Sequence, residues 1–325
     1  MLSHPDFKEK NIIIVFTNEG QYFSFKNDNL VVKDKEDKVV LQSTCHQLLA
    51  LWVVGHCSLS SGLMERSKKF GFPIVLFSFN FRMIGAWNAP TEGNYLLRKK
   101  QYAYQDWTIA KHLMHNKIEN QIETLNSIRK KTPACKDAIQ SLRSYQSQLP
   151  QTKELSDIMG LEGVASRLYF EQWFFTLPWK GRKPRAKIDP INVLLDIGYT
   201  FLFYMVENML HLYGFDIYEG VYHRNFYNRK SLVCDLQEPF RCIVDKQVKR
   251  AYGLGQIKAE DFIFEKGQYK LTPLKSKEYT RWLMQGILEY KSDIFLYCQK
   301  YYRCFIREKP IAEYPFFTIS SPQNS

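Results

Sequence analysis

The sequence lacks the cysteine patterns that hold a structural metal ion or a disulfide framework. Its seven cysteines are odd in number and scattered, and no two of them form a Cys-x-x-Cys pair. Structural zinc sites use closely spaced cysteines and histidines, and disulfide scaffolds use even sets of cysteines. Both are therefore disfavoured, and a reduced, cytoplasmic protein is expected.

Signals for secretion or for a membrane span are also missing. The first ten residues are polar and of mixed charge, whereas a secretory signal is basic and then apolar. The longest apolar run, residues 194–213, is interrupted by Asp196, Glu207 and His211. A core helix is expected there, and no membrane partner is expected.

Acidic residues are comparatively few. The chain has 33 Asp and Glu against 45 Lys and Arg, which gives a net charge of +12. An excess of this size favours polyanionic partners, with nucleic acid ahead of an acidic membrane surface.

The first ninety residues carry short strand signals separated by turns. The β-branched run at 11–16, the turn at 18–20 and an aromatic run at 22–25 predict a hairpin. Further strands are expected at 30–32, 39–41, 51–54, 73–79 and 82–87, with a helix at 60–69 that Gly71 ends. This pattern is typical of a small antiparallel sheet or sandwich, for which we expect a scaffold or dimerisation role.

Beyond a cluster of breakers at 90–94, the pattern becomes helical. Helices are expected at 96–102, 117–128 and 134–148, and the tail from Pro310 to Ser325 is expected to be disordered or to face a partner. The predicted fold class is therefore α+β. An N-terminal antiparallel β-sandwich domain (1–90) is followed by a larger all-α C-terminal domain (91–325).

One helix of the second domain, expected over Leu155–Trp173, carries a carboxylate on its apolar side. At helical spacing Glu162 shares a stripe with Ile158, Ala165 and Tyr169, which Met159 widens. An inward Glu costs several kcal/mol unless it is paired, protonated or bound to a cation, so a compensating group is required.

Further acidic residues follow about sixty positions downstream. His223 ends a turn, and a helix that Ser231 would cap places Asp235 and Glu238 three residues apart on one face. Because Pro239 cannot donate to the carbonyl of Asp235, the helix should bend just after Glu238 and expose these side chains at a cleft.

Glu162, His223, Asp235 and Glu238 together offer three carboxylates and one imidazole. Such a set suits Mg²⁺ or Mn²⁺ better than zinc, and those ions support phosphodiester chemistry. Spacing alone leaves plainer interpretations open: an Asp/Glu pair of this kind is commonly a solvated helix face, and a lone His is commonly structural.

Basic residues flank these positions and suit a phosphate backbone. Arg98 and Lys99 lie in the first turn of an expected helix, where an anion would relieve their repulsion from the helix dipole. The loop 179–187 holds five cations within nine residues, and a solvated face or linker would look similar. The DNA-contacting residues expected on these grounds are Arg98, Lys99, Arg182, Lys183, Arg185, Arg229, Lys230 and Arg241.

At these residues the chain resembles a known family. The motifs at 159–170, 189–199, 220–223 and 231–241, in this order, resemble those of the CRISPR-associated (Cas) protein one, the integrase that inserts new spacers into CRISPR arrays. The junction at 90–94 with the leucines that follow is similar as well. The stretch 224–228 departs from the family, so loop contacts to DNA are not carried over.

The resemblance implies an N-terminal β domain that forms a homodimer and a helical catalytic domain. It implies a metal site made by Glu162, His223 and Glu238, with Asp235 close by and Arg241 beside it. The implied reaction is attack by the 3′-hydroxyl of a short double-stranded DNA on a phosphodiester of the CRISPR repeat, with related nicking activity. A small ferredoxin-like adaptation protein, Cas protein two, is implied as the bridge between two dimers.

Two other functions remain open. One is a structure-specific DNA repair nuclease that uses water as its nucleophile. The other is a non-catalytic DNA-binding scaffold, in which the carboxylates form internal salt bridges with Arg167, Arg229 or Arg241.

Overall fold

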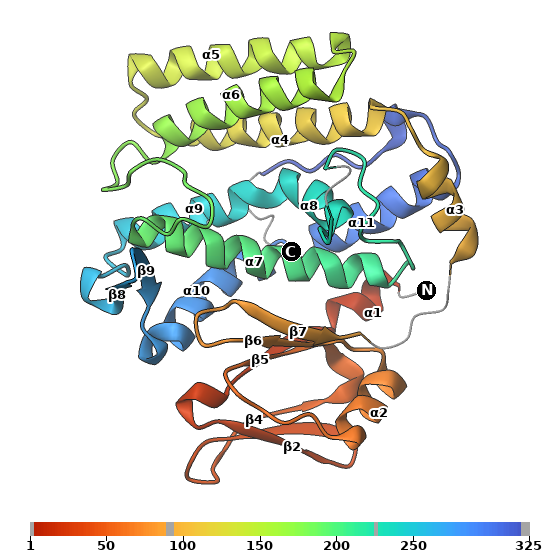
Figure 1. Cartoon of the computed structure of the whole chain (residues 1–325), viewed down its shortest axis with the longest axis vertical. Helices are drawn as coiled ribbons and strands as arrows, with labels where there is room; N and C mark the ends of the chain where they lie inside the picture. Colours follow the sequence, from red (N-terminus) through yellow and green to blue (C-terminus); the bar gives the residue numbers. More distant parts are fainter. Residues whose placement is uncertain (1–2, 89–93, 224–226, 320–325) are drawn as a thin grey trace. The chain divides into compact units, whose positions relative to one another are not determined.

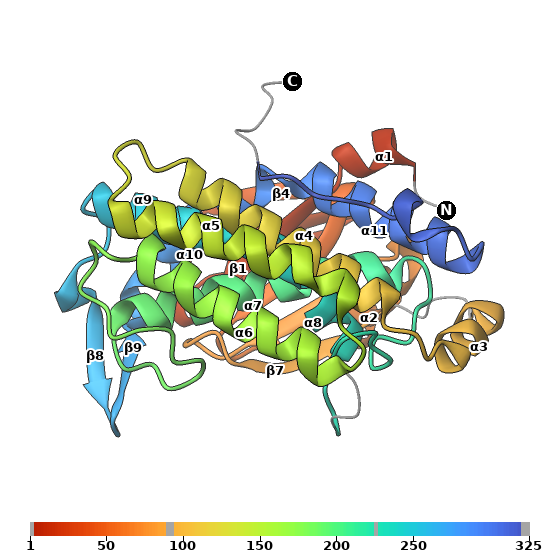
Figure 2. The same ribbon diagram turned by 90° about the horizontal axis from the view of Figure 1, so that it is seen from above.

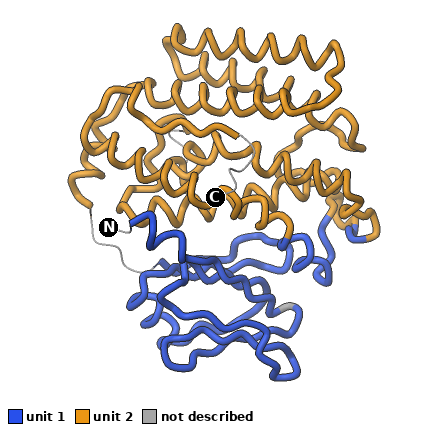
Figure 3. The backbone as a smooth tube through the Cα atoms, turned by 180° about the vertical axis from the view of Figure 1, so that it is seen from behind, with its two compact units in different colours: residues 1–93, 261–263, 270–281 blue, residues 94–260, 264–269, 282–325 orange. Residues whose placement is uncertain are grey.

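A computed structural model describes residues 3–88, 94–223 and 227–319 of the chain. The protein folds as two compact units (Figure 3). Unit 1 comprises residues 1–93, 261–263 and 270–281, and unit 2 comprises 94–260, 264–269 and 282–325. Most of the junction expected at 90–94 lies outside the described residues.

Unit 1 contains two sheets. The first is four-stranded with the order β1-β5-β6-β7, made by β1 (Asn11–Phe16), β5 (Leu48–Val54), β6 (Ile74–Phe77) and β7 (Met83–Trp87). The second has the order β2-β3-β4, made by β2 (Tyr22–Lys26), β3 (Asn29–Lys33) and β4 (Val39–Thr44). Two helices, α1 (His4–Lys8) and α2 (Ser61–Phe70), complete the N-terminal part of the unit.

The strand pairing differs from the expected all-antiparallel arrangement. β5 pairs in parallel with both β1 and β6, and only β6 and β7 are antiparallel in that sheet. The predicted hairpin between 11–16 and 22–25 is wrong, because the 3₁₀ turn Thr17–Glu19 carries the chain from the first sheet into the second. All seven residues of β5 are buried, as is typical of a strand with parallel neighbours.

The core of unit 1 lies between residues of both sheets and α2. Val15, Leu51 and Val53 of the first sheet pack in one cluster with Leu30 and Val32 of the second. The helix α2 begins and ends where the sequence predicts: the Ser60 hydroxyl accepts a hydrogen bond from the Leu63 amide, and Gly71 adopts φ +71° at the C-terminal cap.

Unit 2 is helical, with a small contribution from the hairpin β8 (Phe262–Glu265) and β9 (Gln268–Leu271), whose residues are divided between the two units. This hairpin departs from the expected all-α second domain. The α+β class itself is confirmed. The helices are α3 (Tyr95–Ala103), α4 (Thr108–Asn126), α5 (Pro133–Gln148), α6 (Leu155–Trp173), α7 (Pro190–His211), α8 (Ser231–Gln237), α9 (Arg241–Gly253), α10 (Ser276–Leu288, shared with unit 1) and α11 (Lys291–Ile306).

Three of these helices form a layer. α4, α5 and α6 run side by side and pack against one another (Figures 1 and 2). α4 begins well before the expected residue 117, since its first turns are as apolar as its middle. α7 is long and apolar enough to cross a membrane, but 83% of its most apolar window is buried in the protein, as in a core helix.

The C-terminal segment corrects another expectation. The described part of the tail packs against α4 and is ordered there. The Asn116 amide exchanges two hydrogen bonds with the backbone of Phe317, and Asn120 bonds Phe317 and Ile319. These side-chain amides replace the backbone partners that an extended segment would otherwise find in a sheet.

Candidate active site

The helix α6 brings Glu162 toward the interior. Its N-terminus is fixed by a capping box between Glu154 and Asp157, and its buried face includes Ile158 and Tyr169. The Glu162 side chain keeps 20% of its surface exposed at the edge of that face. Met159, expected on the same stripe, is 51% exposed. The apolar stripe is therefore narrower than the sequence suggests.

The group that compensates Glu162 is a lysine of α4. Lys117 Nζ lies 2.5 Å from Glu162 Oε1 and 2.6 Å from Glu238 Oε2, so one ammonium joins the two carboxylates. Ser166 also donates to Glu162 Oε1 at 2.7 Å, and the Tyr222 hydroxyl bonds Glu162. Sequence reasoning brought Glu162 and Glu238 together but missed both Lys117 and Tyr222.

Electrostatics favours the charged form of all three groups. Burial acts to lower the pKa of Lys117, but the carboxylates of Glu162 and Glu238 outweigh it and raise that pKa. Burial acts in the opposite direction on the pKa of Glu162, where Lys117 prevails and lowers it. Despite burial, Arg241 and Lys117 hold the pKa of Glu238 at about 2.

His223 is oriented by Asp235. The imidazole Nδ1 lies 2.7 Å from Asp235 Oδ1, and the carboxylate also accepts hydrogen bonds from the backbone amides of Val221, Tyr222 and His223. With Nδ1 engaged by a fully buried carboxylate, Nε2 is the nitrogen left for another partner. This carboxylate–histidine arrangement is the one that orients metal-binding histidines in proteins.

Asp235 and Glu238 face different groups, although their spacing predicts that they lie close enough to bind one cation. Asp235 faces the turn at 221–223, whereas Glu238 faces Lys117 and Arg241. The bend predicted at Pro239 is present: α8 ends at Gln237, and the 3₁₀ turn Glu238–Phe240 precedes α9. Because the helix axis changes direction at Glu238, two carboxylates one turn apart reach different groups. Ser231 is the first residue of α8 rather than its cap, which is Lys230.

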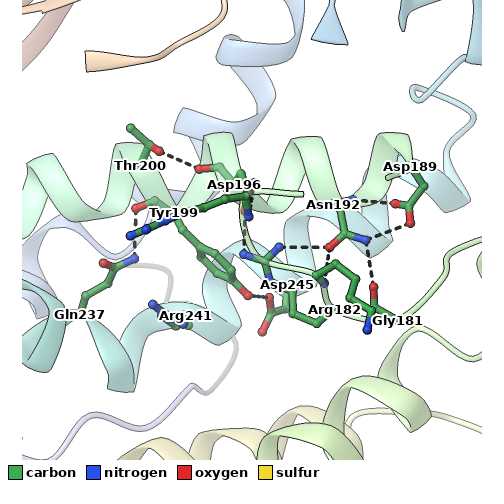
Figure 4. Close-up of polar contacts among 12 residues, drawn as sticks. Gly181, Arg182, Asp189, Asn192, Asp196, Tyr199, Thr200, Gln237, Arg241 and Asp245 are labelled. Atoms are coloured by element: carbon green, nitrogen blue, oxygen red, sulfur yellow. Dashed lines mark hydrogen bonds and ion pairs between the residues drawn. The ribbon is translucent and has the colours of Figure 1, made fainter. Parts of the chain in front are cut away.

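Arg241 is held beside the carboxylates by an aromatic ring. Its guanidinium lies 3.3 Å from Glu238 Oε1 and 4.9 Å from the ring centre of Tyr199, which also receives Arg182 at 5.3 Å (Figure 4). The Tyr199 hydroxyl donates to buried Asp245, which also accepts from Tyr169 at 3.0 Å. The network thus connects α6, α7 and α9 behind the carboxylate pair.

The basic residues expected to bind DNA fall into two groups. Several are committed to partners within the protein: Arg182 pairs with Asp196 at 2.7 Å, Lys230 with Glu207 at 2.6 Å, and Arg98 donates to the Gly214 carbonyl. Arg229 contacts Cys234, and Arg241 pairs with Glu238. In contrast, Lys99, Lys183 and Arg185 are exposed, and none of them has an ion pair in the described part of the chain. The prediction from sequence did not separate the two groups.

The side chains that could hold a divalent ion are not yet arranged around one position. Within residues 3–88, 94–223 and 227–319, no three His, Cys, Asp or Glu side chains already converge as a metal site. Lys117 lies between Glu162 and Glu238, and Asp235 is turned away. The carboxylates of Glu162 and Glu238 and the Nε2 atom of His223 nevertheless match the ligand preferences of Mg²⁺ and Mn²⁺. These residues therefore fit such an ion if the Lys117 ammonium moves away.

The comparisons with known proteins show the family of the chain. The family described as "CRISPR associated protein Cas1" matches residues 14–284. The "CRISPR-associated endonuclease Cas1 1" of Thermodesulfovibrio yellowstonii is 29% identical over 282 residues, covering 80% of this chain and 86% of that protein.

Solved structures share the fold. A CAS1 protein from Thermotoga maritima superposes with a TM-score of 0.79 at 18% identity, covering 91% of this chain and 97% of that one. A chain of a "Cas6-RT-Cas1–Cas2 complex" superposes with a TM-score of 0.81 at 24% identity, covering 96% of this chain, which spans only 36% of that longer chain.

The family match places the chain in a class of CRISPR-associated proteins. In this chain a β-stranded unit is followed by a helical unit, and the oriented His223 lies in a turn of the helical unit. The chain belongs to the Cas1 family.

Proposed function

We propose that this protein is a metal-dependent DNA endonuclease and integrase of CRISPR adaptation. The observation that carries the proposal is that Glu162 and Glu238 both contact the Lys117 ammonium, and that the oriented His223 is close enough to act on Glu238. The net charge of +12 suits a DNA substrate. Membership of the Cas1 family and the endonuclease name of the relative from Thermodesulfovibrio support it.

Glu162, Glu238 and the Nε2 atom of His223 would hold a Mg²⁺ or Mn²⁺ ion. Such an ion polarises a phosphodiester and increases the reactivity of a nearby hydroxyl. Asp235 contributes by holding His223 through Nδ1, and it is a positioning residue because it does not face the other carboxylates. Arg241 offers a guanidinium next to Glu238 that can neutralise a phosphate oxygen.

The proposed reaction is a transesterification. The 3′-hydroxyl oxygen of the incoming DNA forms a bond to a phosphorus atom of the CRISPR repeat, and the bond from that phosphorus to the 3′ oxygen of the repeat strand breaks. The attacking hydroxyl loses its proton, and the departing oxygen gains one. With water in place of the 3′-hydroxyl, the same arrangement gives hydrolysis, which is the endonuclease activity.

We also propose the assembly that this reaction requires. The N-terminal domain (1–90) would form a homodimer, and the C-terminal domain (91–325) would carry the chemistry. A small ferredoxin-like protein, Cas protein two, would bridge two dimers. The name of the related Cas6-RT-Cas1–Cas2 complex supports that partner.

Glu162→Ala and His223→Ala test the catalytic assignment. Each is expected to abolish strand transfer into repeat DNA while the circular dichroism spectrum remains that of the native protein. Glu171→Ala, on an exposed position of the same helix, is the matched control and should retain activity. Normal strand transfer by either site variant would refute the assignment.

A second function is favoured by one specific observation. Lys117 and Arg241 already neutralise the carboxylates, as a non-catalytic DNA-binding scaffold would require. Calorimetry with Mn²⁺ separates the two functions, because the scaffold predicts no specific ion binding. A repair nuclease is distinguished by substrate: integration requires a free 3′-hydroxyl on the incoming DNA, whereas hydrolysis of a branched substrate does not.

A further inference from the structure

Lys117 occupies an unusual position for a lysine. Its side chain is 8% exposed, and its ammonium is bound directly by two carboxylates that come from different elements, α6 and the turn Glu238–Phe240. Lysine is rarely buried unless it is paired, so the two carboxylates are what allow a charged lysine at this position.

The helix α4 holds Lys117 in place. Its inward face carries polar side chains one turn apart, and these neighbours have partners of their own: Asn116 and Asn120 bind the backbone at Phe317, and Gln121 donates to Ser166 at 3.2 Å. Ser166 in turn donates to Glu162, so the lysine and its carboxylate are fixed by one hydrogen-bonded set.

A divalent ion bound by both glutamates would have to lie where this ammonium lies. Mg²⁺ binds its oxygen ligands at about 2.1 Å, and the ammonium lies 2.5 Å from Glu162 Oε1 and 2.6 Å from Glu238 Oε2, which leaves no separate position between these two oxygens. At these two oxygens an ion and the ammonium would therefore exclude each other.

We propose that Lys117 is a resident counter-ion of the active site, which keeps Glu162 and Glu238 together before metal binding and which the divalent ion must displace. This inference rests on the proposed metal-dependent function. It predicts that the wild-type site is ordered without metal and binds the ion only weakly, because each binding event breaks two buried ion pairs.

The test measures Mn²⁺ binding directly. Lys117→Gln removes the competing charge and leaves a shorter hydrogen-bond donor. By calorimetry it should bind Mn²⁺ at least about tenfold more tightly than the wild-type protein, because displacement of the ammonium is no longer required. In chelator its melting temperature should fall by several degrees, and Mn²⁺ should restore it. Lys111→Gln is the matched control: it removes one charge from the same helix at a lysine whose hydrogen bonds within the described residues go to the Pro150 and Thr152 carbonyls. Its Mn²⁺ affinity should equal that of the wild-type protein, and Mn²⁺ should raise the melting temperatures of this variant and the wild-type protein equally.

The outcomes separate this inference from the function on which it rests. Equal or weaker Mn²⁺ binding by Lys117→Gln, with binding retained by the wild-type protein, overturns the counter-ion role and leaves metal dependence standing. No binding by either protein overturns both. If Lys117→Gln does not fold, the wild-type protein with ¹⁵N-labelled lysines answers the same question. Addition of Mg²⁺ should move the Lys117 ammonium resonance, and an unchanged resonance overturns the inference.

Discussion

The Asp235 carboxylate binds His223 twice, through the imidazole Nδ1 at 2.7 Å and through the backbone amide at 2.9 Å. The ring and the turn that carries it are therefore positioned by the same group. We therefore expect Asp235 to affect the reaction by positioning His223, and not by contacting the substrate or an ion.

Asp235→Asn should lower strand transfer by about 10- to 100-fold, because Asn has one accepting oxygen and must leave either His223 or the Val221 and Tyr222 amides without an acceptor. Mn²⁺ affinity should fall in parallel. A variant that is only less stable, but still folded, would bind Mn²⁺ as the wild-type protein does. Single-turnover assays and calorimetry on the folded variant check this. Asp216→Asn, which touches exposed Tyr102, is the control. An Asn variant with unchanged metal affinity would argue against the positioning role.

Gly220→Ala should disturb the contact between Asp235 and His223 from the turn that carries His223. A Cβ atom at this position would lie 2.7 Å from Asp235 Oδ2 and from the Ser231 side chain, so the turn must move. A loss of stability of about 1–3 kcal/mol is expected, together with lower activity. Gly160→Ala on α6 is the contrast, because nothing lies within 4 Å and alanine favours a helix by up to about 1 kcal/mol. Urea denaturation of the two variants should therefore shift in opposite directions.

Asp245 predicts a pH dependence of stability. Burial raises its pKa from 3.8 to about 6, although Tyr199 and Tyr169 donate to it. The folded state therefore holds this proton more tightly than the unfolded state, and stability is lost as the pH rises from about 4 through about 6. A shift of this size corresponds to about 3 kcal/mol at most.

Asp245→Asn should remove this loss. The difference in unfolding free energy between the variant and the wild-type protein, measured in urea from pH 4 to 7, should change in favour of the variant as the pH rises. Glu238, whose pKa is about 2, contributes stability in the opposite direction with pH. It is present in both proteins, so its contribution cancels when the two unfolding free energies are subtracted. A difference that is constant across this range would contradict the buried acid.

The exposed basic residues and those paired within the protein should respond differently to substitution. Lys183→Ala and Arg185→Ala should weaken DNA binding and each lower the salt slope of log K by about 1, with unchanged stability, because these exposed cations have no ion pair in the described residues. Arg182→Ala should instead lower the melting temperature, since it removes the partner of Asp196 and of Asn192. Fluorescence anisotropy at several salt concentrations and thermal denaturation provide the two readouts. Equal effects of the three changes on DNA binding would refute the division.

Much of this architecture can be predicted from local signals. The helix at Leu155–Trp173, the helix end at Gly71 in the first unit and the bend at Pro239 each depend on neighbours in the sequence, and the structure confirms them. Strand pairing depends on distant residues, which is why the parallel β1–β5 pair was mistaken for a local hairpin. Spacing also failed for Asp235 and Glu238, because a bend directs neighbouring side chains to different groups.

Lys117 could not be predicted from the carboxylates and the histidine. Metal ligands are acidic residues and histidines, and their pattern in the sequence does not indicate a lysine as the group that compensates them. One signal was present: Asn116, Lys117, Asn120 and Gln121 repeat polar residues at helical spacing within an otherwise apolar segment. A buried polar stripe of this kind indicates that the helix meets charged or hydrogen-bonding partners.

The hold of Asn116 and Asn120 on Phe317 has a consequence for biosynthesis. While a ribosome is still translating the codons before Phe317, the two amides that flank Lys117 lack their backbone partners, and water must occupy those places. The segment of α4 that carries Lys117 therefore gains these hydrogen bonds only after Phe317 has been made, and the acidic centre is complete only then.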